Sequence, residues 1–173
     1  LDDRMAAFLA AQPVFFVATA PASGGHVNLS PKVYADTFAV LGPHTVAYLD
    51  LTGSGVETIA HLRENGRITL MFCAFAGPPK IVRLYGTGRA VLAGDDEWDE
   101  FAGRFPARTG RRAVVVVEVE RIADSCGYAV PFLELVAERD VLERSHERRG
   151  ADGLVAYRAE RNATSIDGLP GLR

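Results

Sequence analysis

A small hydroxyl-rich turn is the part of this sequence best suited to chemistry. Residues 47–51 have the pattern of a buried strand, which leads through Thr52-Gly53-Ser54-Gly55 into a helix. Such a turn brings free backbone N–H groups and the positive end of a helix dipole together, which favours binding of an anion. Ser54 and Glu57 also have the spacing of a capping box, which predicts a helix from Ser54 to Glu64. Most capping boxes only start helices, so the turn by itself does not establish a site.

Short strands must position this turn. Strands are predicted at residues 14–19, 26–34, 37–40, 45–51, 67–75, 80–92 and 112–122. Helices are predicted at residues 2–11, 54–64, 95–104, 141–149 and 152–161. In residues 80–92 two glycines fall on one face of the alternating strand, which is typical of a barrel corner. The pattern indicates a mainly β chain with flanking helices, folded as a closed antiparallel barrel.

Composition narrows the classes of protein. The 173 residues are most simply one domain, with residues 1–137 as the barrel and the charge-dense residues 138–173 as its helical extension. A net charge of −3 provides no basic surface for nucleic acid. No apolar run approaches the roughly 20 residues that cross a bilayer. We therefore expect neither nucleic acid nor a membrane as a partner.

The cysteines and histidines bear on the cellular compartment and on metal binding. The two cysteines cannot form a disulfide framework, and the acidic beginning of the chain does not resemble a signal peptide, so we expect a cytoplasmic protein. No pair among the four histidines has metal-ligand spacing, so no metal is expected.

The ordered set of segments resembles the pyridoxamine 5′-phosphate oxidase-like family, the FMN-binding split β-barrels. The resemblance covers roughly residues 5–125 and rests on residues 28–32, 47–62, 65–72 and 82–88 in that order. The segments 125–131 and 165–170 are similar to a poorly characterised subgroup of the family. The resemblance implies an antiparallel split β-barrel that binds FMN in a cleft between the two subunits of a homodimer.

The resemblance also implies roles for individual residues. Residues 28–32 would line the flavin ring or phosphate, residues 48–50 the ribityl chain, and the turn the phosphate. Arg83 would reach the cofactor from the partner subunit, and Tyr128 would stack on the ring or pack at the interface. The implied cofactor-binding residues are Asn28, Leu29, Ser30, Lys32, Tyr48, Leu49, Asp50, Thr52, Ser54, Thr58, Arg83 and Tyr128. Alternatively, Lys32 is an exposed edge residue and Asp50 caps a turn.

Two departures from the family pattern bear on function. The oxidase proper has an Arg-Lys pair where this chain has Glu57 and Thr58, so Lys32 and the turn amides would have to neutralise the phosphate. Arg144-Ser145-His146 looks like the pair that binds pyridoxal phosphate, but it lies in a charge run typical of a solvated helix face. Vitamin B6 oxidation is therefore not expected.

Three hypotheses follow from these observations. The first is an FMN-dependent oxidoreductase acting on a small organic substrate, with no catalytic side chain assigned. The second keeps the reaction class and replaces FMN with an 8-hydroxy-5-deazaflavin. The third is a non-catalytic module that binds flavin or haem, or a barrel without a cofactor, and Glu57 favours it.

Overall fold

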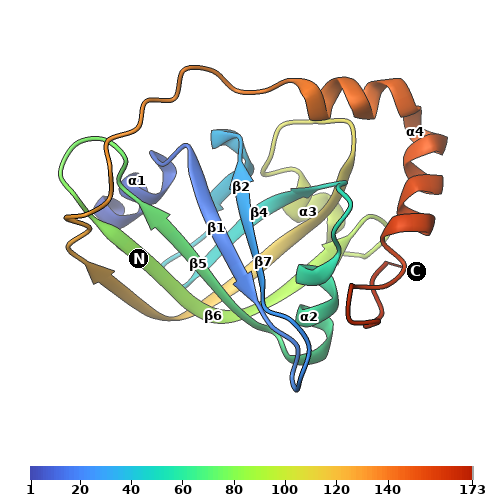
Figure 1. Ribbon diagram of the computed structural model, residues 1–173, viewed down its shortest axis with the longest axis horizontal. Helices are drawn as coiled ribbons and strands as arrows, with labels where there is room; N and C mark the ends of the chain where they lie inside the picture. The colour runs from blue at the N-terminus through green and yellow to red at the C-terminus, as the bar shows by residue number, and fades with distance from the viewer. Residues whose placement is uncertain (173) are drawn as a thin grey trace.

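Seven antiparallel strands form one curled sheet in the computed structural model, which describes residues 1–172 (Figure 1). The strands are β1 (Val14–Thr19), β2 (Asn28–Val33), β3 (Phe38–Val40), β4 (Thr45–Leu51), β5 (Arg67–Cys73), β6 (Ile81–Leu92) and β7 (Arg111–Ser125). Their order across the sheet is β2-β1-β5-β6-β7-β4-β3. Within the described residues β2 and β3 remain unpaired edges, so the barrel is split. The split barrel is confirmed, and the expectation of a closed barrel is wrong.

Helices flank this half-barrel. They are α1 (Asp3–Ala10), the short 3-10 helix η1 (Ala35–Thr37), α2 (Glu57–Asn65), α3 (Trp98–Ala102) and α4 (Val141–Arg161). Gly150, with φ 64° and ψ −178°, interrupts α4, so the two helices predicted there are the two arms of one bent element. None of the helices in residues 1–172 is both long enough and apolar enough to cross a membrane. Arg173, the last residue of the predicted extension, lies outside the described residues.

The start of α2 differs from the prediction. The helix begins at Glu57 with Val56 as its N-cap, and no side chain caps it. The capping-box interpretation of Ser54 is therefore wrong, because the backbone carbonyls of residues 53–55 accept hydrogen bonds from other parts of the chain instead of starting the helix. The predicted end is confirmed, since Gly66 closes the helix in the left-handed conformation at φ 71°.

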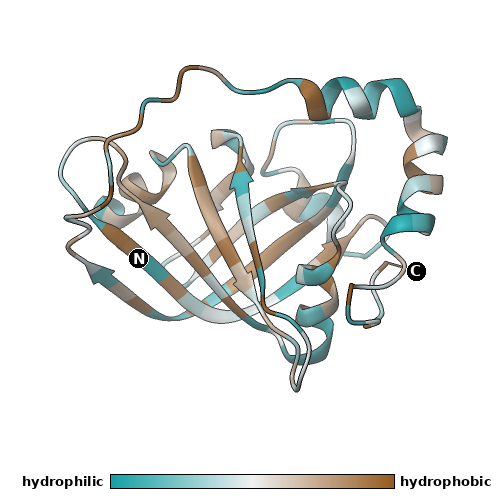
Figure 2. Ribbon diagram, viewed as in Figure 1, coloured by the Kyte–Doolittle hydropathy of each residue, from teal (hydrophilic) through white to brown (hydrophobic). Residues whose placement is uncertain are grey.

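The core is built mainly from strand residues and lies inside the curl of the sheet, and Figure 2 shows hydrophobic colours along these strands. The rings of Phe15 and Phe72 stack with centroids 5.1 Å apart, and Phe38 and Tyr48 meet the Phe15 ring at steeper angles. The strands can coil this tightly partly because of Gly86, which sits at an irregularity in the pairing of β6 with β7. A Cβ there would overlap the backbone oxygen of Glu118, so a side chain is excluded.

Candidate ligand site at the strand-to-helix turn

A buried carboxylate organises the end of β4. Asp50 is 2% exposed, and Lys32 Nζ lies 2.8 Å from its Oδ1. Arg112 places Nε and Nη2 each 2.7 Å from Oδ2. Burial by itself would raise the pKa of Asp50, but the two cations outweigh it and the pKa is lowered. Asp50 is therefore ionised, and it engages both Lys32 and Arg112.

The turn after Asp50 is held from the inside of the protein. Arg112 donates from Nη1 to the carbonyl of Gly55 at 2.7 Å and to Asn162 Oδ1 at 3.1 Å. Asn162, fully buried just after α4, donates from Nδ2 to the carbonyl of Gly53 at 2.9 Å. Residues from β7 and from the C-terminal end of the chain therefore shape a turn that lies far from them in sequence.

His146 attaches the first arm of α4 to the same turn. Its Nε2 lies 2.8 Å from the carbonyl oxygen of Thr52, and its Nδ1 lies 3.1 Å from that of Thr109. The ring is 3% exposed. Arg144 instead pairs with Asp140 at 2.9 Å on the exposed side of the helix. Arg144 and His146 thus make different contacts and do not form a joint phosphate clamp. The predicted solvated helix face is confirmed for Arg144 and wrong for His146, because the carbonyls of Thr52 and Thr109 hold the imidazole in a buried position.

A second polar network connects β2 to α2. Ser30 donates to Asn28 Oδ1 at 2.8 Å, and Asn28 Nδ2 donates to Thr58 Oγ1 at 3.0 Å and to Thr19 Oγ1 at 3.2 Å. The Thr19 hydroxyl lies 2.9 Å from His61 Nδ1. His61 is fully buried, and this burial lowers its pKa, so the imidazole is neutral. The network fixes the start of β2 against the first turns of α2.

Between these two networks lies a cavity of about 490 Å³, here called the turn cavity. Its walls come from the start of β2, the turn, the first residue of α2 and the C-terminal loop. The lining residues are His26, Val27, Asn28, Leu29, Ser54, Gly55, Glu57 and Ile166. None of them is a lysine or an arginine, while the Glu57 carboxylate lies over Gly55, 2.5 Å from where a Cβ would stand. The cavity is therefore of a size for a small molecule but carries negative charge.

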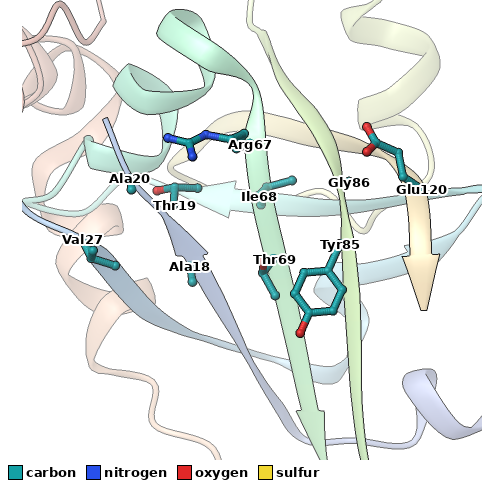
Figure 3. A pocket seen from close by; sticks show the side chains of 10 residues that line it. All are labelled: Ala18, Thr19, Ala20, Val27, Arg67, Ile68, Thr69, Tyr85, Gly86 and Glu120. Atoms are coloured by element: carbon teal, nitrogen blue, oxygen red, sulfur yellow. The ribbon is translucent and has the colours of Figure 1, made fainter. Parts of the chain in front are cut away.

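A second cavity of about 390 Å³, the outer-face cavity, lies on the convex side of β1, β5 and β6 (Figure 3). Figure 3 shows Tyr85 of β6 beside it, with Arg67 and Glu120 on neighbouring strands. Val27 lines both cavities, so they adjoin at the start of β2. A larger hollow of about 750 Å³ lies between α3 and α4, but no residue that the resemblance assigns to the cofactor lines it.

The structure brings together most of the residues assigned to the cofactor and separates others from them. Near the turn lie Asn28, Leu29, Ser30, Lys32, Asp50, Thr52, Ser54 and Thr58. Tyr48 is buried in the core at 0% exposure, and Leu49, at 3%, is buried in a second apolar cluster with Ala102 and Phe105. Arg83 contacts Ser125 at the far end of β6, and Tyr128 is 82% exposed on the segment after β7. The cofactor roles of all these residues remain predictions.

Sequence reasoning missed five residues that build this region. They are His26, Arg112, His146, Asn162 and Asp167. Arg112 directly precedes the apolar run of β7, and a charge at the start of a buried strand was the available signal for it. His146 was part of the Arg144-Ser145-His146 motif, which the surrounding charge run made look solvent-exposed. The others lie in turns or charged helices, where most polar residues only face solvent.

Comparison with known proteins agrees with this arrangement. The family model for pyridoxamine 5′-phosphate oxidase matches residues 1–126. The pyridoxamine 5′-phosphate oxidase family protein ustO of Aspergillus flavus is 40% identical over 188 residues, which cover 99% of this chain and 76% of that protein.

Solved structures share the fold. A single-residue variant of HupZ from Group A Streptococcus is 25% identical with a TM-score of 0.53, over 72% of this chain and 98% of that one. An FMN-binding protein from Syntrophomonas wolfei is 18% identical with a TM-score of 0.50, over 69% and 82% of the two chains. The match over most of the sequence, on a split barrel with the expected strand-to-helix turn, means that this chain belongs to the pyridoxamine 5′-phosphate oxidase family.

Proposed function

We propose that this protein binds a flavin and is a flavin-dependent oxidoreductase acting on a small organic substrate. The observation that carries the proposal is the turn cavity, which is lined by Asn28, Leu29 and Ser54, three of the residues that the family pattern assigns to the cofactor. Family membership and the FMN-binding protein that shares the fold support it. The adjoining outer-face cavity extends the space toward Tyr85, whose ring is suited to contact a flat heterocycle.

The phosphate of FMN does not fit the turn. A phosphate needs cationic or N–H donors, and two of the cations near the turn, Lys32 and Arg112, are engaged by Asp50. A third, Arg158, donates to Thr52 Oγ1 at 3.3 Å and does not line the turn cavity. The Glu57 carboxylate lies at the N-terminus of α2, where the phosphate would bind. The cofactor that we propose is therefore a flavin, and not FMN in particular.

We further propose that two copies of the chain form the cleft for the ring. Leu29 and Val33 of β2 are 65% and 50% exposed and alternate with the less exposed residues of this edge strand. Leu29 is paired with Ala18 of β1, which lines the outer-face cavity. An edge strand with exposed apolar side chains is favourable for association, and a second copy would cover it. Light scattering coupled to gel filtration measures this directly, and a dimer mass is expected.

The absorption spectrum of the purified protein, before and after addition of a flavin and removal of the excess, tests the cofactor. A retained flavin spectrum together with a raised melting temperature supports the proposal, because a ligand that binds only the native state must stabilise it. Bluer absorption and fluorescence would instead indicate the deazaflavin alternative. Absence of retained colour and of any thermal shift would contradict the proposal.

A second candidate is a barrel that binds its ligand without catalysis. The negative charge of Glu57 at the turn favours it, because the family's phosphate contact is missing there. Reduction of the bound flavin separates the two functions. A flavin that is retained but accepts no electrons from reduced nicotinamide cofactors or candidate substrates supports the non-catalytic module.

A further inference from the structure

The turn cavity has two places where a phosphate would find hydrogen-bond donors, and each holds a carboxylate of this chain. The first is the N-terminus of α2, where the Glu57 side chain folds over Gly55. The helix dipole favours a negative charge at this position, and Glu57 supplies it. The Glu57 Oε1 also lies 3.3 Å from the backbone nitrogen of Ile166, so the C-terminal loop helps to keep the carboxylate there.

The second place is the end of the hairpin between β1 and β2. His26 donates from its backbone N–H to Asp167 Oδ2 at 2.8 Å, and its Nδ1 lies 2.7 Å from Oδ1. Gly25 leaves the room that this contact needs, since a Cβ there would stand 2.7 Å from Oδ2. The hydrogen bonds from His26 lower the pKa of Asp167, so its carboxylate is ionised. The C-terminal loop thus supplies the anion that this hairpin binds.

The groups left for a ligand are a hydroxyl and an imidazole nitrogen. The Ser54 hydroxyl and His26 Nε2 make no hydrogen bond to any other group in residues 1–172. A hydroxyl and an imidazole nitrogen are suited to the hydroxyls of a polyol, and the apolar lining of Val27, Leu29 and Ile166 is suited to the carbons of a ligand. Two carboxylates, with no lysine or arginine among the lining residues, disfavour a dianionic phosphate in the same space.

We infer that the turn cavity selects a flavin whose ribityl end carries no phosphate, such as riboflavin, over FMN. This inference rests on the proposed function, because it names the flavin for the same site. Glu57 and Asp167 are the specificity-determining residues: they exclude the phosphate by charge and by occupying its donors. His26 and Ser54 contact the terminal hydroxyls.

Titration of the full-length protein with riboflavin and with FMN, followed by flavin fluorescence, tests the inference. The wild type is expected to bind riboflavin at least about 10-fold more tightly than FMN, and added salt should narrow the difference because it screens like charges. Glu57→Gln keeps the shape of the side chain and removes its charge. It should raise FMN affinity several-fold relative to riboflavin affinity, while Glu100→Gln on the exposed face of α3 should leave the ratio of the two affinities unchanged.

Tighter binding of FMN than of riboflavin by the wild type would overturn the inference, as would an unchanged FMN affinity in Glu57→Gln. If neither flavin binds, the proposed function fails, and inorganic phosphate then tests the charge argument independently. Phosphate should leave the NMR signals of the Ser54 and Gly55 amides unmoved in the wild type and shift them in a Glu57→Gln, Asp167→Asn double variant. A phosphate shift in the wild type, or none in the double variant, contradicts the exclusion.

Discussion

The turn after β4 and the convex side of β2 flank the polar network that connects β2 to α2. The polar groups of the turn find their partners within the chain, whereas the apolar side chains of β2 do not. At the turn, Asp50, Arg112 and Asn162 are almost fully buried and hydrogen-bonded to one another or to the backbone. On the convex side, Leu29 and Val33 are exposed and contact little. The chain closes the polar turn with its own C-terminal residues and leaves the apolar strand face open.

This difference indicates which surfaces of the chain another molecule would cover. Buried polar groups without partners are costly, so the turn must be satisfied inside each chain if the monomer is to fold. Exposed apolar side chains cost less free energy than buried polar groups without partners, so they can stay exposed until a second copy or a ligand covers them. The same contrast continues after β7, where Phe132 and Val136 are 83% and 91% exposed on an extended segment.

The largest expected effect comes from breaking the ion cluster at the turn. Arg112→Met leaves Asp50 buried with only Lys32 as a partner, which should lower the free energy of unfolding by about 3–5 kcal/mol. Urea denaturation measures it. Arg89→Met removes an exposed pair with Glu97 and is the matched control, with an expected loss of about 0–1 kcal/mol. Equal losses in the two variants would mean that the cluster does not hold the turn.

A smaller loss is expected from Asn162→Ala. The variant removes the 2.9 Å donor of the Gly53 carbonyl, which keeps only a 3.4 Å contact from Arg112, and it removes the Asn162 acceptor of Arg112 Nη1. The loss should cost about 1–3 kcal/mol of unfolding free energy. Glu160→Ala, on the exposed side of α4 two residues before, is the control in the same denaturation series. A neutral Asn162→Ala would show that α4 does not close the turn in solution.

Acid should weaken the polar network between β2 and α2. Because burial lowers the pKa of His61 below its usual 6.5, the unfolded chain binds a proton that the folded chain does not. The stabilisation is present above 6.5 and is lost as pH falls through the folded pKa. Unfolding free energies measured from about pH 8 down to about pH 5 should therefore fall more steeply for wild type than for His61→Asn. Parallel curves would contradict a buried neutral His61.

The smallest effect on the stability of the monomer is expected on the convex side of β2. Val33→Lys places a charge on an exposed position, so unfolding of the monomer should change by no more than about 0.5 kcal/mol. The dimer should weaken, because a charge would be buried between copies. Val155→Lys on α4, where the side chain is 58% exposed, is the control. A dimer mass that is unaffected by Val33→Lys would place the interface elsewhere.

The strands could be predicted because their pattern is local. β1 is a short run of apolar β-branched and aromatic residues, and in β6 apolar and polar residues alternate. The bounds of both strands match the expectation within one residue. The end of α2 at Gly66 follows from the one residue type that adopts the left-handed conformation freely. The start of α2 could not be predicted, because tertiary hydrogen bonds to residues 53–55 override the capping signal of Ser54.

The sequence by itself determined the fold family and the element that carries the candidate site, because both depend on short-range patterns of apolar residues, glycines and turns. Only the tertiary structure decided which charged groups of that site are available to a ligand. Lys32 and Arg112 are cations by type, but Asp50 engages both of them across 18 and 62 positions of the chain. Asp167 reaches His26 across 141 positions. Which charges remain free for a ligand depends on such distant pairs, and no local pattern specifies them.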